Sequence, residues 1–136
     1  MKFLPVPVEY LDDKWQDIKP ILNKAVCLSP RKIDIEDVYT ASKQGAYLVW
    51  TVEEKDKVIA VVTTRMVFYP KGYAMALDFV GGGRMKEWIE LVLSTLEAHA
   101  RHNKCIHMEG FGRKAWDRFI NKFGWYPAHI TYHKDL

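Results

Sequence analysis

Three consecutive glycines and an arginine, Gly81 to Arg84, follow a strand-like pattern over residues 73–80 and precede a helical pattern over residues 85–102. Glycines leave backbone N–H groups unobstructed, and the start of a helix adds free N–H groups and a partial positive charge. This junction therefore predicts an anion site that fits a pyrophosphate. The spacing matches neither a P-loop nor the dinucleotide fingerprint, and a plain strand-to-helix turn that needs positive φ explains the same residues.

Two carboxylates lie near the same junction in the predicted fold. Asp78 falls in the strand over residues 73–80, and Glu109 ends a short strand predicted over residues 105–109. A carboxylate beside a reacting amine can take its proton, which makes both residues candidate general bases. Each could equally be a helix cap or an ion-pair partner.

His99, His102, Cys105 and His107 form a cluster in the sequence. Its spacing lacks the paired ligands of a known zinc finger, so no metal site is predicted. Cys105 opens an apolar strand, where cysteine usually serves as a small buried residue rather than as a nucleophile.

The net charge of +3 arises after residue 80, because residues 1–80 carry 11 basic and 11 acidic side chains and residues 81–136 carry 9 and 6. Four basic residues lie on a helix predicted over residues 113–123: Arg113, Lys114, Arg118 and Lys122. They could contact a cofactor phosphate, nucleic acid or only water. The absence of an arginine or lysine run argues against nucleic-acid binding.

The elements that must position these residues follow from hydrophobic periodicity and turn signals. After a strand-like or irregular start, we expect a helix with Asp12 and Asp13 in its first turn, kinked or divided at Pro20. A second helix runs from about Asp34 to Gly45. The remaining elements are a hairpin over residues 47–52 and 58–68, a strand over 73–80, a helix over 85–102, a strand over 105–109, a helix over 113–123 and a last strand over 127–134.

The fold class follows from this order of elements. Apolar residues recur at helical spacing over residues 85–102, so one face of this helix should lie on the sheet. Because the helix joins two strands, we expect those strands to be parallel. The prediction is an α+β fold in the order ααβββαβαβ, with a mixed sheet flanked by helices, formed by one domain over residues 1–136.

Cys27 and Cys105 are isolated cysteines without disulfide-type spacing, and residues 1–7 lack the apolar core of a signal peptide. We therefore expect a reduced, intracellular protein. No apolar run approaches the roughly 20 residues needed to cross a bilayer, so no membrane partner is expected.

The element order, the glycine turn before a long helix and Phe123-Gly124-Trp125 after the later helix resemble the GNAT superfamily of N-acetyltransferases over nearly the whole chain. In that family the turn holds the pyrophosphate of acetyl-CoA, and the pantetheine arm runs between the splayed fourth and fifth strands. By this resemblance, Asp78 to Val80 would border the arm here. The resemblance implies acetyl-CoA as cosubstrate and these cofactor-binding residues: Phe79, Val80, Gly81, Gly82, Gly83, Arg84 and Arg113.

The chain departs from the family pattern at several positions. The glycine turn is shorter than usual, and Arg84 follows the glycines instead of preceding them. Counting back from Gly124 places Ile120 where the family often has a tyrosine, and Arg113 where it often has an asparagine. Isoleucine has no proton to give to a departing thiolate, so the usual general acid is missing.

Two functions remain open at this point. One is an acetyl-CoA-dependent N-acetyltransferase in which an unidentified amine attacks the thioester directly, with Glu109 preferred over Asp78 as the base. The other is a catalytically inactive protein of the same fold that contacts other subunits. Trp15 with Pro20 and residues 48–50, 62–65 and 112–116 also resemble small GNAT-like proteins of tailed bacteriophages. That likeness implies the cytoplasm of a bacterial host, or the virion for an inactive assembly protein.

Overall fold

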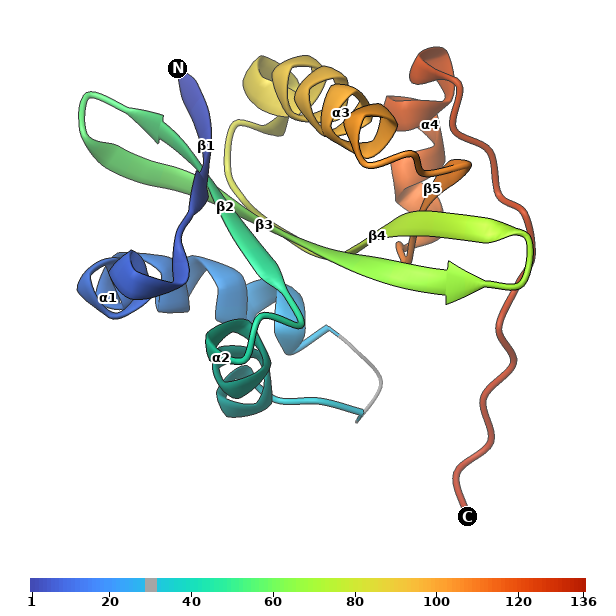
Figure 1. The fold of residues 1–136 in the computed structure, drawn as a ribbon, viewed down its shortest axis with the longest axis horizontal. Coiled ribbons are helices and arrows are strands. Elements are labelled where there is room, and N and C mark those ends of the chain that lie inside the picture. Colours follow the sequence, from blue (N-terminus) through green and yellow to red (C-terminus); the bar gives the residue numbers. More distant parts are fainter. Residues whose placement is uncertain (29–31) are drawn as a thin grey trace.

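The structure is a computed structural model that describes residues 1–28 and 32–136. A curved sheet has α1 and α2 on one face and α3 and α4 on the other (Figure 1). The elements are, in chain order, β1 (Lys2–Val6), α1 (Val8–Val26), α2 (Ile35–Lys43), β2 (Leu48–Glu54), β3 (Lys57–Tyr69), β4 (Gly72–Gly82), α3 (Met85–His102), β5 (His107–Gly110), a helical turn (Lys114–Trp116), α4 (Asp117–Ile120) and a second helical turn (Asn121–Phe123).

The sheet has the strand order β1-β2-β3-β4-β5. The first three pairs are antiparallel, and β4 pairs with β5 in parallel, so the predicted mixed sheet and its parallel pair are confirmed. Over the described residues, however, the element order is βααβββαβα rather than ααβββαβαβ. The two orders differ at the two ends of the chain.

At the N-terminus the irregular start is a true strand, β1, which pairs with β2 over its whole length. Pro5 is tolerated because β1 is an edge strand whose outer side needs no ladder donor. The first helix starts at Val8, earlier than the acids at Asp12 and Asp13 suggested, and it is not divided at Pro20, which lies on its exposed side.

At the C-terminus the predicted helix consists of α4 and two short helical turns, and Gly124 ends it in a left-handed conformation (φ 91°), as expected. The predicted strand over residues 127–134 is wrong, because no strand forms there. A strand exists only by pairing, and this segment makes no backbone hydrogen bond to the described residues.

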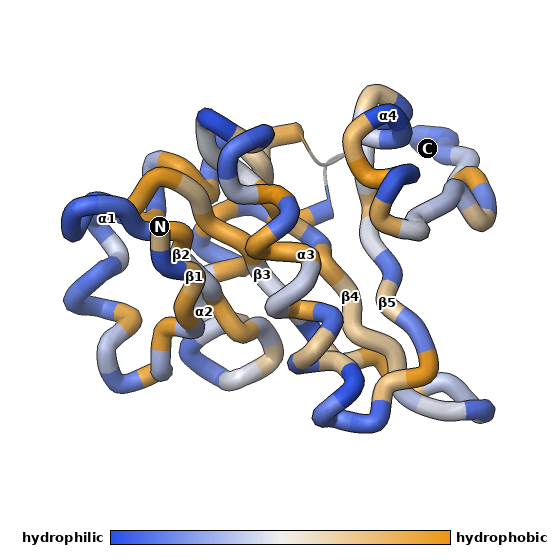
Figure 2. The backbone as a smooth tube through the Cα atoms, turned by 90° about the horizontal axis from the view of Figure 1, so that it is seen from above, coloured by the Kyte–Doolittle hydropathy of each residue, from blue (hydrophilic) through white to orange (hydrophobic). Residues whose placement is uncertain are grey.

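The core has two halves, one on each face of the sheet. Leu11, Ile18 and Leu22 of α1 pack on one face with residues of β2 and β3. On the other face α3 presents Trp88, Ile89, Val92, Leu93, Leu96 and Ala100. Figure 2 shows β2 and β3 as mostly hydrophobic, as expected for strands covered on both faces. In the described residues no helix is long and apolar enough to cross a membrane.

Candidate functional site

The parallel strands β4 and β5 separate at the candidate site. Their last register pair is Leu77 with Gly110, after which β5 ends and β4 continues to Gly82. A Cβ on Gly110 would lie 3.1 Å from the carbonyl oxygen of Leu77, so glycine allows the close approach of the strands there. Beyond that pair, the β5 side of β4 has no strand partner among the described residues. We call this end of the strand pairing between β4 and β5 the opening.

β4 bulges where the opening begins. On β3 only Thr63 stands opposite two residues of β4, Asp78 and Phe79. The N–H of Phe79 donates to Oγ1 of Thr63 (3.3 Å), and the Phe79 ring is buried edge-on against Tyr47 on the α1 face. A bulge changes the direction of side chains, and here it sends the Phe79 ring into the core under α1. Only the backbone of Phe79 therefore borders the opening.

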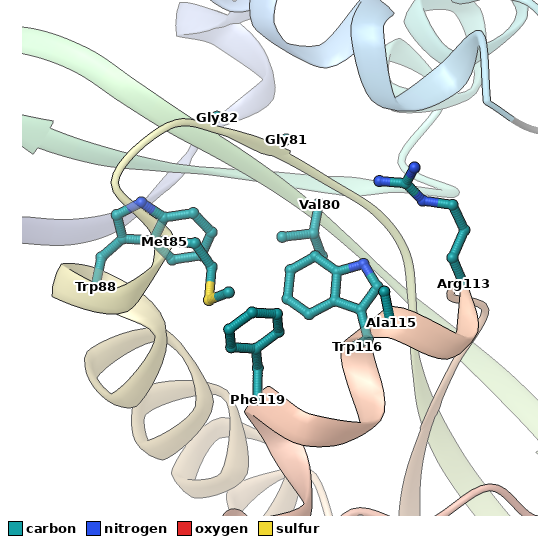
Figure 3. A pocket seen from close by; sticks show the side chains of 9 residues that line it. All are labelled: Val80, Gly81, Gly82, Met85, Trp88, Arg113, Ala115, Trp116 and Phe119. Atoms are coloured by element: carbon teal, nitrogen blue, oxygen red, sulfur yellow. The ribbon is translucent and has the colours of Figure 1, made fainter.

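A pocket of about 190 Å³ lies on the α3 face of the opening. We call it the α3-side pocket, and Figure 3 shows Met85, Trp116 and Phe119 pointing into it from α3 and from the segment after β5. Its walls are largely apolar and aromatic, and they bring together the following residues: Val80, Gly81, Gly82, Met85, Trp88, Arg113, Ala115, Trp116 and Phe119.

The glycine run is not the free turn that the sequence suggested. Gly81 and Gly82 belong to β4 and pair with Val61 and Ala60 of β3. A Cβ on Gly81 would lie 2.8 Å from a carbonyl oxygen of α1, and one on Gly82 would lie 2.4 Å from a carbonyl oxygen of β3, where φ is also 128°. Packing alone therefore requires both glycines, and the turn into α3 is made by Gly83, which has open space around it, and by the following residue.

Arg84 makes this turn in the left-handed conformation (φ 60°) and is bound by two carboxylates. Its guanidinium donates to Glu87 (2.7 Å) and to Glu54 (2.8 Å), and these hydrogen bonds, the one to Glu87 first, raise the pKa of Arg84. The indole N–H of Trp88 donates to the carbonyl oxygen of Gly83 (2.7 Å). An anion at the start of α3 would thus meet an arginine whose charge is already matched by two carboxylates.

Arg113 lies at the edge of the α3-side pocket, immediately before the first helical turn that follows β5 (Figure 3). Its side chain is exposed, and no ion pair forms between it and any described residue. Of the two arginines predicted to contact a phosphate, this one is available.

The opposite face of the opening carries charged side chains in direct contact. Asp78, whose side chain is only 8% exposed, accepts from Nε (2.7 Å) and Nη2 (3.2 Å) of Arg65 on β3. The hydrogen bond to Asp78 raises the pKa of Arg65. The pKa of the nearby Tyr47 is raised by burial and then by the charge of Asp78. Asp78 is thus an ion-pair partner in the structure, which was the alternative to its role as a base.

Glu109 lies on the same face and accepts three hydrogen bonds. Tyr69 donates from its hydroxyl to both carboxylate oxygens (2.8 and 3.0 Å), and Nε2 of His107 donates to Oε1 (2.9 Å). Burial alone would raise the pKa of Glu109, but these hydrogen bonds lower it overall. The carboxylate is therefore ionised at neutral pH. We refer to Arg65, Tyr69, Asp78, His107 and Glu109 as the α1-side cluster.

The remaining candidates have structural roles. Ile120, at the position where the resembled family often has a tyrosine as general acid, packs against the core on the α3 face. Its side chain therefore offers no proton for a leaving thiolate. Burial raises the pKa of Cys105, whose sulfur lies 3.9 Å from that of Met66, as expected for a packing role. His99 stacks edge-on against Trp50. Among the described residues no group of three or more histidine, cysteine or carboxylate side chains could hold a metal ion.

Sequence reasoning missed the partners of the two carboxylates, Arg65, Tyr69 and His107. Their contacts depend on the register of three strands. At the positions where β4 lies between these side chains of β3 and β5, its own residues are Ala74 and Ala76. The alanines were a readable signal, because small residues on a central strand allow long side chains on its neighbours to meet above it.

Comparison of the chain with protein-family models and with curated protein sequences finds no match. Solved structures, in contrast, match over nearly the whole chain. A ribosomal-protein-alanine N-acetyltransferase from Brucella melitensis biovar Abortus 2308 superposes with a TM-score of 0.75 at 10% identity, covering 100% of both chains.

Two further structures have the same fold. Glucosamine-6-phosphate N-acetyltransferase from Arabidopsis thaliana gives a TM-score of 0.71 at 16% identity, covering 98% of this chain and 97% of that one. A predicted acetyltransferase from Clostridium acetobutylicum, solved with acetyl-CoA, gives 0.71 at 14%, covering 98% and 95%. The chain thus has the α+β fold of the GNAT acetyltransferases, and at these identities the likeness concerns the fold alone.

Proposed function

We propose that this protein is an acetyl-CoA-dependent N-acetyltransferase. The observation that carries the proposal is the opening between β4 and β5, beside which an apolar pocket with a free arginine lies on one face of the sheet and a hydrogen-bonded carboxylate at the end of β5 lies on the other. A cofactor and an amine could approach the same point from opposite sides of the sheet. The structural neighbours described as acetyltransferases support this reading of the fold.

The residues of the α3-side pocket fit a narrow, uncharged arm better than a bulky or ionic group. The pocket is small and lined by aromatic and apolar side chains, with one cation at its edge, Arg113. The backbone of Val80, Gly81 and Gly82 would border the pantetheine arm, and Arg113 would contact a phosphate of CoA. The turn at Gly83 and Arg84 fits the pyrophosphate less well, because Glu54 and Glu87 stand beside it.

When bound, acetyl-CoA supplies a thioester whose acyl carbon accepts an amine. Glu109 is our preferred residue for holding the incoming amine and receiving its proton, since Asp78 is already paired with Arg65. Tyr69 and His107 fix the orientation of the Glu109 carboxylate. No side chain of the pocket serves as an acid for the leaving thiolate. A free thiol has a pKa of about 8.5, so a thiolate can leave near neutral pH and take its proton from water.

The test is calorimetric titration of the full chain with acetyl-CoA. We expect binding, and we expect Arg113→Gln to weaken it about 10-fold, because a charge-assisted hydrogen bond to phosphate is lost. Lys114→Gln is the matched control: it removes the same charge one residue away, does not line the pocket and should leave the affinity nearly unchanged. No binding by the wild type at millimolar acetyl-CoA would contradict the proposal.

A second candidate is a non-catalytic protein of the same fold, of which a virion or assembly component is one form. Two observations favour it: Arg84 is neutralised by carboxylates, and the core residue Ile120 occupies the position of the usual acid. The titration separates the two candidates. If the protein has lost cofactor binding, neither the wild type nor Arg113→Gln gives heat when it is titrated with acetyl-CoA. The link to phage rests on the sequence resemblance alone.

A further inference from the structure

A second pocket, larger than the α3-side pocket, lies near the other end of α3. Its volume is about 450 Å³, and we call it the β3-edge pocket. It is lined mainly by apolar side chains of the sheet, among them Leu48, Met66, Phe68 and Met75, and by His99 of α3. It shares no residue with the α3-side pocket, so cofactor binding does not account for it.

The β3-edge pocket lies beside an open stretch of strand. β2 pairs with β3 only as far as Thr64, opposite Leu48, whereas β4 pairs with β3 as far as Tyr69. Figure 1 shows the hairpin of β3 and β4 extending beyond the start of β2. Residues 65–69 therefore have a strand partner on one side only among the described residues, and we call them the β3 edge.

The strand pairing shows which backbone groups are open at the β3 edge. Tyr73 of β4 faces β5, because its carbonyl oxygen accepts a hydrogen bond (2.8 Å) from the residue before β5. Successive residues of a strand face opposite neighbours, so Ala74 faces Val67 of β3. Val67 thus uses its N–H and C=O on β4, and Met66 and Phe68 direct theirs outward, where they have no partner among the described residues.

The β3 edge also exposes a large aromatic side chain. Phe68 is 73% exposed, and its ring stacks edge-on (4.9 Å between centroids) against that of Tyr73, which is 46% exposed. Proteins usually prevent edge pairing with lysine, proline or a bulge. Residues 65–69 contain neither lysine nor proline, and the bulge against β4 lies before them. Their only charge, on Arg65, is paired with Asp78.

We propose that the β3 edge pairs with the same edge of a second copy, antiparallel and around a two-fold axis at Val67. The edge is self-complementary in this arrangement, because Met66 of each copy stands opposite Phe68 of the other and each open N–H meets an open C=O. Residues that oppose each other across two strands share a face. The partner's Phe68 therefore lies beside Met66, in the β3-edge pocket.

The charges around the pocket favour a neutral ring as its occupant. Burial, and then the charge of His102, lowers the pKa of His99, so this imidazole is neutral at pH 7. Arg65 is matched by Asp78 and would stand opposite the partner's Tyr69. The two edges thus oppose no like charges, and an aromatic side chain enters a pocket without free charge.

The area available suits a weak dimer. A whole aromatic side chain buries roughly 150–250 Å², so the exposed parts of Phe68 and Tyr73 amount to on the order of 200 Å² per copy. The pocket wall and the edge backbone that they cover add a comparable area. The total for two copies is on the order of 1,000 Å², the lower limit for a specific interface, so we expect a dissociation constant in the micromolar range.

The experiment combines sedimentation velocity with amide hydrogen exchange on the full chain, from about 5 to about 500 μM, a range that brackets a micromolar dissociation constant. We expect a dimer at the upper end, where the amides of Met66 and Phe68 exchange more slowly than at the lower end. The Val67 amide, already bonded to β4, should be slow throughout. Phe68→Lys should weaken the dimer about 10-fold or more, because it places a charge in an apolar pocket.

Phe111→Lys is the matched control, since Phe111 is also an exposed phenylalanine (64%) but follows β5, away from the β3 edge. It should leave the dimer intact. Both side chains are exposed in the single chain, so both variants should keep the wild-type circular dichroism spectrum and report on association alone.

Every other result overturns the inference. A monomer at all concentrations means that the β3 edge stays free or takes a different partner. A dimer in which the amides of Met66 and Phe68 stay fast, or one that Phe111→Lys breaks and Phe68→Lys does not, means that another surface joins the copies. None of these readouts depends on acetyl-CoA, so their failure is separate from failure of the proposed function.

Discussion

The two faces of the β4–β5 opening carry different chemistry. On the α3 side the walls are aromatic rings and bare backbone, with the exposed Arg113 at the edge. On the α1 side both carboxylates of the α1-side cluster are hydrogen bonded, Asp78 to Arg65 and Glu109 to Tyr69 and His107. An anionic ligand with an apolar arm suits the first face and a cationic amine suits the second. The comparison teaches that one strand, β4, separates the two environments, because its residues alternate between faces and its bulge reorients Asp78 and Phe79.

The largest expected effect concerns the bare backbone on the α3 side. Gly82→Ala should lower the free energy of unfolding by about 3 kcal/mol, because the new Cβ meets backbone 2.4 Å away at a residue with φ 128°. Gly83→Ala is the matched control: the neighbouring position has open space, and the change should stay within about 0.5 kcal/mol. Urea unfolding of both variants measures the difference. Equal stabilities of the two variants would show that Gly82, like Gly83, lies in a turn without close packing.

Some elements of the fold could be predicted from the sequence more accurately than others. The helix over residues 85–102 was predicted with the bounds it has as α3, because its apolar period, its breaker glycines and its polar face all agree. The second helix was equally well marked, since Asp34 caps it with a full capping box and Gly45 follows its end with φ 84°. Signals of this kind are local, so one sequence is enough to find them.

The failures around the candidate site and at the C-terminus depend on partners distant in the sequence. Gly81 and Gly82 belong to β4 because β3 is long enough to pair with them, and no local rule contains the length of a neighbouring strand. The pairing of Arg65 with Asp78 depends on the bulge opposite Thr63. The last strand was predicted from a real alternation, but whether it forms depends on an edge that the pattern does not name.

The second largest expected effect concerns the ion pair between Arg65 and Asp78 on the α1 side. Asp78→Ala should lower the free energy of unfolding by about 2 kcal/mol, because it leaves the half-buried guanidinium of Arg65 without its bidentate partner. Glu97→Ala breaks an exposed pair with Arg101 on α3 and should cost less than about 0.5 kcal/mol. Thermal or urea unfolding of the two variants compares them directly. If both cost the same, the α1-side pair behaves as ordinary surface charge, and the contrast between the two faces is lost.

The smallest expected effect is the pH-dependent contribution of Glu109 to the free energy of unfolding. Burial opposes ionisation of Glu109, yet the hydrogen bonds from His107 and Tyr69 outweigh it and lower the pKa. A lowered carboxylate pKa stabilises the folded state fully above the unfolded value of about 4.3 and loses this contribution as the pH falls through the folded value. Glu109→Gln should therefore cost about 1 kcal/mol at pH 7 and progressively less below pH ~4.

Glu90→Gln is the control for this pH series, since Glu90 lies on the solvent face of α3 and has no hydrogen-bond partner among the described residues. Its effect on the free energy of unfolding should be near zero at every pH. The measurement is urea unfolding of the wild type and both variants from pH 7 to pH 3. A cost of Glu109→Gln that persists at pH 3 would assign the loss to packing of the side chain. In that case the carboxylate charge would not distinguish the α1 side from the α3 side.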